Sequence, residues 1–172
     1  MSARAGVGAL GVALLAVLIF LAVSSWSRQP AVATPSNQPI NFPHNVHVGT
    51  YKIDCQYCHS EARRSEYAGL PSVERCMGCH KIVAAQGNPE VQKVHEHWNA
   101  KRPIEWVRIH KVPNYVYFPH KRHIAKGLRC QECHGPVEAM QRVAQVAPLS
   151  MGWCIECHDR KQGPLDCATC HH

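Results

Sequence analysis

This sequence has few aromatic residues, few alternating β-branched runs and no cysteine outside its short C-x-x-C-H motifs. Phe, Trp and Tyr make up only 7% of the 172 residues, and runs with a period of two, which predict half-buried strands, are scarce. The chain is long enough for one modest domain, but it offers few large side chains for an ordinary apolar core. We therefore expect almost no sheet and little regular secondary structure, with short helices and loops wrapped around a core that is not made of protein alone.

Five C-x-x-C-H motifs use all ten cysteines. This spacing is the attachment signature of a c-type haem. Positions i, i+3 and i+4 share one face of a helical turn, so the two thiols can reach the vinyl groups of one porphyrin while the histidine reaches its iron as the proximal ligand. The predicted covalent attachment residues are Cys55, Cys58, Cys76, Cys79, Cys130, Cys133, Cys154, Cys157, Cys167 and Cys170, and the predicted proximal ligands are His59, His80, His134, His158 and His171.

Structural zinc and disulfides are the alternatives for so many cysteines. Five C-x-x-C pairs cannot combine evenly into four-cysteine zinc sites, and histidine follows every pair although it is only 13 of 172 residues. A disulfide framework fits poorly, because C-x-x-C loops are short and no long-range pattern is left over. The sequence therefore predicts five covalently bound haem c groups.

Basic residues outnumber acidic ones, 19 to 12, which gives a formal net charge of +7. That balance alone suggests an anionic partner such as nucleic acid or a membrane surface. Each haem would add two propionates and one positive charge from ferric iron, which brings the oxidised protein to about +2 by charge counting. Because no basic helix or aromatic stacking platform is present, we expect no nucleic-acid partner.

The N-terminal segment favours a membrane anchor. Between Arg4 and Arg28 lie 23 uncharged residues, which as a helix would extend about 35 Å, enough to cross a bilayer. Trp26 stands where an interfacial aromatic is expected. A cleaved secretory signal is the alternative, because residues 31–33 resemble a cleavage site, but the apolar run is longer than a usual signal core. We expect a cytoplasmic tail and a retained transmembrane helix within residues 1–26.

The anchor has a predicted orientation. Haem attachment to C-x-x-C-H is an extracytoplasmic reaction in bacteria, so we expect a single span in the bacterial cytoplasmic membrane with the haem domain on the periplasmic side. Residues 27–41 form a linker in which Pro30, Pro35 and Pro39 disfavour helix.

An internal repeat organises the rest of the chain. FPHNVHVGTYKIDCQYCH starts at Phe42 and FPHKRHIAKGLRCQECH at Phe118, and a second haem motif follows each. The predicted parts are a first di-haem module (42–80), a spacer (81–117) with a helix from Pro89 to Asn99, and a second di-haem module with the fifth haem appended (118–172).

Five six-coordinate irons need five distal ligands. The repeated F-P-H-x-x-H supplies four candidates, and two histidines on one helical turn can serve two different haems. These candidates are His44, His47, His120 and His123. For the fifth ligand, His110 comes first, and Met151 and Met140 follow because a thioether is the other common axial ligand. The remaining alternatives are His95, His97 and His172.

The repeat resembles the F-x-H-x-x-H element of class III multihaem cytochromes. In that family the first histidine binds the haem that follows it in sequence, and the second binds another haem. The resemblance implies that His44 and His120 serve the haem of the next motif, while His47 and His123 reach other haems.

Longer stretches carry a second resemblance. WVRIHKVPNYVYFPHKRH, from Trp106, and CHGPVEAMQRVAQVAPLSMGWCIECH, from Cys133, together with the anchor and five motifs, are similar to the pentahaem cytochrome c subunit (ActA) of alternative complex III. The resemblance covers about residues 42–171. It implies a membrane quinol oxidoreductase as host, with an iron–sulfur subunit, multi-span subunits and a mono-haem cytochrome as partners. It also implies that this chain passes electrons to a soluble acceptor or a terminal oxidase.

The expected function is electron transfer along a row of haems, without a substrate site of the chain's own. A free-standing membrane-anchored quinol dehydrogenase is one alternative, but the Pro-rich linker lets the first haem stand away from the membrane. A catalytic multihaem reductase is another; it needs an open iron position, whereas eight spare histidines can cap five irons. A role of the haems as mere scaffold is disfavoured by five motifs in so short a chain.

Overall fold

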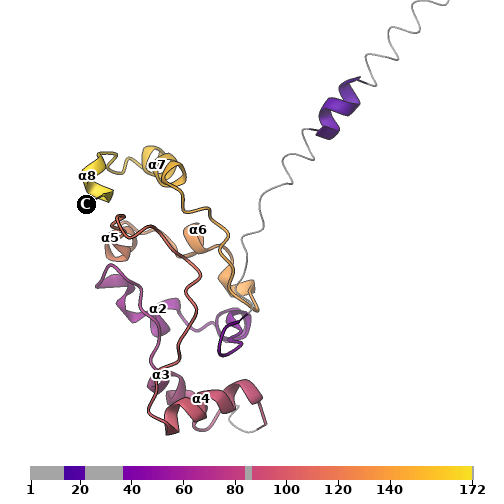
Figure 1. Cartoon of the computed structure of the whole chain (residues 1–172), viewed down its shortest axis with the longest axis vertical. Helices are drawn as coiled ribbons and strands as arrows, with labels where there is room; N and C mark the ends of the chain where they lie inside the picture. Colours follow the sequence, from indigo (N-terminus) through magenta and orange to yellow (C-terminus); the bar gives the residue numbers. More distant parts are fainter. Residues whose placement is uncertain (1–13, 22–36, 84–86, 172) are drawn as a thin grey trace, which may run out of the picture. The chain divides into compact units, whose positions relative to one another are not determined.

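The computed structural model describes residues 14–21, 37–83 and 87–171, and the chain divides into two units, Met1–Ala31 and Val32–His172. In the second unit the described residues form short helices joined by loops (Figure 1). In chain order these are η1 (Asn45–Thr50), α2 (Cys55–Cys58), η2 (Ser60–Arg63), α3 (Val73–His80), α4 (Pro89–Asn99), α5 (His120–Ala125), α6 (Gln131–His134), η3 (Val137–Ala139), α7 (Met151–Arg160) and α8 (Cys167–Cys170). The described residues contain an isolated antiparallel bridge between Val116 and His171 but no strand. The expectation of short helices and almost no sheet is confirmed.

Within the first unit the structure describes residues 14–21, which are helical with exposed side chains. No helix in the described part of the chain combines the length and the apolar character that a bilayer span requires. Most of the predicted anchor (1–26) and of the predicted linker (27–41) lies outside the described residues.

The helices that bear the C-x-x-C-H motifs begin at polar capping residues. Asp54, Ser72, Ser150 and Asp166 each accept a hydrogen bond from a backbone N–H of the first helical turn. Such caps satisfy N–H groups that a helix leaves without a partner. The fifth motif helix, α6, follows Cys130 without a side-chain cap. Local sequence therefore fixes where four of these five helical turns begin.

Apolar packing concentrates on α3 and α4. Met77, between the two cysteines of α3, is 2% exposed and packs with Ile40, Val94 and Ile104. The spacer helix α4 spans Pro89–Asn99, as predicted, and begins after Asn88, whose Oδ1 accepts hydrogen bonds from the first turn. Among the described residues this small cluster packs against the Cys76 motif.

The two repeats hold each other by reciprocal contacts. η1, which belongs to the first F-P-H-x-x-H segment, packs on η3, which follows the first haem motif of the second module. α5, which belongs to the second F-P-H-x-x-H segment, packs on η2, which follows the first haem motif of the first module. The backbone N–H of Asn45 donates to the Met140 carbonyl at 2.9 Å, and that of His120 to the Glu66 carbonyl at 3.0 Å. Each histidine-bearing turn is therefore positioned by the opposite module.

Gly49 marks the closest approach of η1 to η3. A Cβ atom at this position would collide with the backbone carbonyl of Glu138, which cannot move away as a flexible side chain could. We predict that Gly49→Ala lowers the free energy of unfolding by about 1–3 kcal/mol, as overpacking does. Gly152→Ala is the matched control, because nothing lies within 4 Å of its Cβ. Thermal unfolding followed by circular dichroism measures both, and an equal midpoint for the two variants would contradict the predicted contact.

Candidate functional site

All five C-x-x-C-H motifs lie on helical turns, as covalent attachment of a haem requires. All ten thiols are free. In the described ranges no group of three or more His, Cys, Asp and Glu side chains is arranged to hold a metal ion by itself.

The five motifs form a series in space, because thiols of neighbouring motifs lie close enough to shift one another's pKa. Burial raises the pKa of Cys55 and Cys58. Beyond burial, Cys130 raises the pKa of Cys55 by its charge and a hydrogen bond, and Cys79 raises that of Cys58. The Cys55 motif therefore lies between the Cys76 and Cys130 motifs.

The series continues toward the C-terminus. Burial raises the pKa of Cys133, and the charge of Cys157 raises it further. Burial also raises the pKa of Cys154, with Cys170 as the next cause. The spatial order is thus the motif helices α3, α2, α6, α7 and α8. Figure 1 shows the same order, from α3, which lies beside α4 at one end of the second unit, to α8 at the other.

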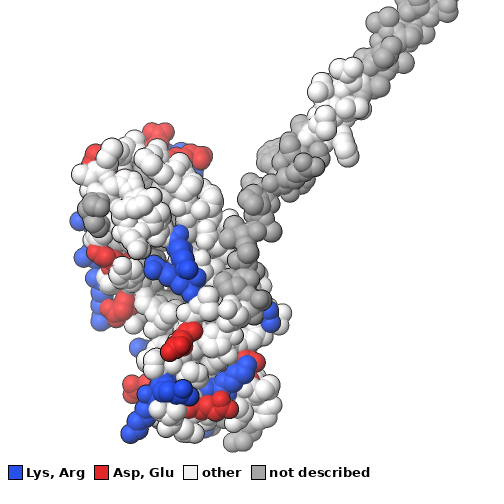
Figure 2. All heavy atoms as spheres, viewed as in Figure 1, with Lys and Arg blue, Asp and Glu red and all other residues white. Residues whose placement is uncertain are grey.

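A cavity of about 600 Å³ lies at the centre of this series, between α2 and α6. The thiols of both motifs line it, among mainly apolar side chains, and so do Arg108, Arg129 and Arg142. An apolar cleft with a few placed charges is what a large flat prosthetic group requires, and guanidinium groups suit its carboxylates. Elsewhere on the face shown in Figure 2, basic and acidic side chains are intermixed.

Histidines of the repeat face the motif histidines in pairs. The ring centroids are 6.0 Å apart for His47 and His80, and 6.0 Å for His123 and His158. The rings of His120 and His134 are nearly parallel at 6.4 Å. Two imidazoles that bind one metal ion from opposite sides, with metal–nitrogen bonds of about 2 Å, place their centroids about 6 Å apart. The spacing therefore fits an iron between the two rings of each pair.

His44 lies near His59, whose charge affects its pKa. Burial, with the charge of His59 next, lowers the pKa of His44 to about 4. In the second repeat the first histidine faces the first motif of its own module and the second faces the second motif. In the first repeat His47 likewise faces the second motif. The assignment of these four as distal ligands stays a prediction, now with one motif for each of them.

Backbone carbonyls orient most of these imidazoles. When Nδ1–H donates to a carbonyl, the lone pair is left on Nε2, which is then free to bind a metal. Six rings form such a bond, at 2.5–3.0 Å: His47 to Pro43, His59 to Gly69, His80 to Val83, His120 to Glu66, His123 to Pro119 and His158 to Pro164. The site is therefore built to present Nε2 atoms.

The Phe and Pro of the repeat support the second histidine of each turn, although the sequence indicated them only as part of the repeat. Phe42 stacks on His47 and Phe118 packs on His123, each with centroids 4.3 Å apart. The proline carbonyl that follows each Phe accepts the hydrogen bond from that same histidine. Their recurrence ahead of both histidine pairs is the sequence signal that could have identified them.

The candidates for a fifth distal ligand are scattered. The ring of His110 lies 4.4 Å from that of His134, nearly perpendicular to it, and its buried Nε2 has no partner among the described residues. The Nε2 of His95 is bonded to the His80 carbonyl. Met151 is 60% exposed at the start of α7, and Met140 follows η3. His110 therefore lies at the Cys130 motif, which His120 already faces.

Burial keeps the central imidazoles neutral. It lowers the pKa of His134 to about 4, with the charges of His110, His120 and His59 as further causes. A histidine must be unprotonated to bind a metal. At neutral pH these rings are therefore in the form that coordinates iron.

Comparisons with known proteins agree with this geometry. The chain matches the class III cytochrome c family over residues 22–111 and cytochrome c7 and related cytochromes over residues 116–172. It is also 31% identical over 118 residues to the multiheme cytochrome c subunit of the menaquinone reductase of Nitratidesulfovibrio vulgaris. That match covers 69% of this chain and 55% of the relative, so the chain spans little more than half of that protein. The protein belongs to the class III cytochrome c family, whose members bind covalently attached haem c.

Proposed function

We propose that this chain is a pentahaem cytochrome c that relays electrons between a quinone-reactive membrane complex and an acceptor outside the cytoplasm. The observation that carries the proposal is the order of the five motif helices along the second unit (Figure 1), in which thiols of neighbouring motifs shift one another's pKa. Haem iron, when bound, takes up and releases single electrons. Electron transfer from one end of the unit to the other requires a series of haems without gaps.

The residues of the chain have three roles in this proposal. Ten thiols would attach the haems, and the five motif histidines would bind their irons. His44, His47, His120 and His123 would supply a second ligand to four of the irons and so exclude exogenous ligands there. The carbonyls that accept from Nδ1 fix the ring orientation, and ligands held in this way rearrange little when the charge of the iron changes.

Within that function, we propose alternative complex III as the host, through the resemblance of residues 42–171. The partners would be the iron–sulfur subunit, the multi-span subunits and the mono-haem cytochrome, and the acceptor a soluble protein or a terminal oxidase. A menaquinone-reducing complex is the second candidate, because the relative from Nitratidesulfovibrio vulgaris is a menaquinone reductase subunit. An N-terminal span that anchors the chain on the periplasmic side suits either host.

The number of haems is the first test. We predict five haem c groups per chain, measured by the pyridine haemochrome assay against protein concentration and by the mass of the intact protein. Cys167→Ser with Cys170→Ser should reduce the count to four, because a haem without its thioether bonds is lost on denaturation. A native count below five, or zinc in place of haem, would contradict the proposal.

The distal assignment is tested at the Cys76 motif. His47→Ala should leave about one iron per chain five-coordinate, with a high-spin EPR signal and one additional site for carbon monoxide in the reduced protein. His95→Ala is the matched control, because His95 contacts the same motif only through the His80 carbonyl. An unchanged spectrum in His47→Ala, or equal changes in both variants, would show that His47 is not a ligand.

The host is tested by purification in mild detergent. We predict that the native chain is isolated with large membrane subunits and that the isolated chain alone oxidises no quinol. Reduction of its haems by menaquinol within the complex would support the quinol-oxidising host, whereas menaquinone reduction driven by the reduced cytochrome would support the second candidate. Quinol oxidation by the isolated chain would instead support a free-standing dehydrogenase.

A further inference from the structure

Two of the facing histidine pairs differ in the angle between their rings. The planes of His120 and His134, which ends α6, are inclined by only 7°. Those of His47 and His80, which ends α3, are inclined by 69°. The spacing of both pairs fits an iron between the rings, so a haem on α6 would have parallel imidazole ligands and a haem on α3 crossed ones.

This angle matters because the π orbital of each imidazole overlaps with a d orbital of the iron. Parallel rings raise the energy of the same d orbital, whereas crossed rings raise one d orbital each and leave the two similar in energy. Low-spin ferric iron has its unpaired electron in this set, so parallel ligands give an EPR signal with three resolved g values and crossed ligands give one large g value. Residues that orient the ligands therefore tune the iron without changing the ligand type.

The Glu66 carbonyl, in the first module, fixes the ring of His120 in the second. The backbone N–H of His120 donates to this carbonyl at 3.0 Å, and Nδ1 of its ring donates to the same oxygen at 2.5 Å. The backbone N–H of Lys121 donates to the Ser65 carbonyl beside it at 3.1 Å. The His120 ring therefore cannot rotate without losing a hydrogen bond.

His110 supplies the contact that fixes the opposite ring, that of His134. Their centroids are 4.4 Å apart and their planes are inclined by 81°, so the edge of one ring meets the face of the other. This arrangement is favourable for aromatic rings, and it is lost if either ring turns. The buried Nε2 of His110 has no partner among the described residues, so the ring contact is what this side chain provides here.

Other contacts hold the crossed pair. Phe42 stacks on His47 with centroids 4.3 Å apart, and the Pro43 carbonyl accepts from Nδ1 of that histidine at 3.0 Å. Nδ1 of His80 donates to the Val83 carbonyl at 3.0 Å. Each ring of this pair is therefore oriented by its own neighbours in sequence, without His110.

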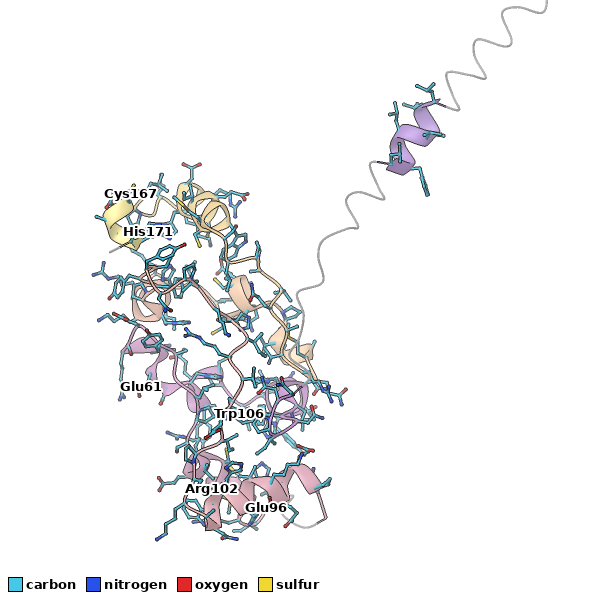
Figure 3. All side chains as sticks on the ribbon, viewed as in Figure 1. Glu61, Glu96, Arg102, Trp106, Cys167 and His171 are labelled. Carbon is cyan, nitrogen blue, oxygen red and sulfur yellow. The ribbon has the colours of Figure 1, made fainter. Side chains whose placement is uncertain are left out.

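The two pairs also lie in different parts of the second unit. α3 packs on α4, and Figure 3 labels Glu96 on α4 and Arg102 beyond it at this end of the unit. α5, which begins at His120, packs on η2, where Figure 3 labels Glu61. The crossed pair can therefore serve as an internal reference for changes at His110.

We propose that His110 is a positioning residue that holds His134 parallel to His120, and that it is not an iron ligand. It makes the haem on α6 electronically different from the haem on α3, although both have two imidazole ligands. The inference rests on the proposed function, because it requires haems at these motifs with histidines of the repeat as ligands. It gives a role to a buried histidine of the spacer that the haem series leaves unused.

Low-temperature EPR of the fully oxidised full-length protein is the test. The native protein should show a signal with three resolved g values and another with one large g value. His110→Ala should shift the resolved signal toward a larger g anisotropy, because the His134 ring can then turn. His110→Phe should preserve it, because a phenyl ring keeps the edge-to-face contact but cannot bind iron. The large-g signal should be the same in both variants.

The ligand variants assign the two signals. His120→Ala should remove the resolved signal, and His47→Ala should remove the large-g signal. His97→Ala is the matched control, because it removes another spacer histidine whose buried ring nitrogen has no partner among the described residues; it should leave the resolved signal unchanged. If His110→Ala does not retain its haems, His110→Leu replaces it, since leucine fills the space without an aromatic edge.

A high-spin signal in His110→Phe would overturn the inference, because it would show that His110 binds iron. An unshifted resolved signal in His110→Ala would also overturn it, as would a native spectrum in which His120→Ala removes a large-g signal. These outcomes leave the haem count unchanged. A count below five haems, with both signals as expected, would instead contradict the proposed function and leave the role of His110 standing.

Discussion

The arrangement depends on one constraint: a single helical turn carries two histidines, and each faces a different motif. His44 and His47 on one turn, and His120 and His123 on the other, can satisfy their partners only if two motif helices lie on opposite sides of the turn. The turn thus fixes the relative position of two attachment sites with very little polypeptide. Among the described residues the buried apolar cluster lies at α3 and α4, and elsewhere the histidine pairs link the motifs instead.

The reciprocal contacts explain why two such modules form a series rather than two separate sites. Since η1 rests on η3 and α5 rests on η2, the first motif of each module is drawn to the middle, and Cys55 comes to lie against Cys130. The second motifs are left on the outside. The spatial order therefore begins at Cys76 rather than at Cys55, although Cys55 comes first in the sequence.

Local features could be predicted from the sequence, and long-range ones could not. The motif turns, the spacer helix from Pro89 to Asn99 and the scarcity of strand follow from residue spacing and composition. The position of His110 against His134 depends on how the spacer crosses between modules, and no local pattern encodes that path. The same holds for the Glu66 carbonyl that orients His120, 54 residues away in sequence. Phe42 and Phe118 recur in the sequence repeat, but their packing on the histidine rings is evident only from the structure.

The repeat also sets the number of histidines that can be supplied. Each module contains two motifs and one F-P-H-x-x-H turn, so the turn supplies two histidines for its own two motifs. A motif added beyond the second module inherits no turn, and its histidine is faced by whatever segment is nearest. Here that segment is the extended chain leading into the second repeat, bonded to α8 through backbone groups that any sequence could supply. Tyr115 is the side chain that this segment places beside His171, outside the pattern by which the two turns place their histidines beside the other motifs.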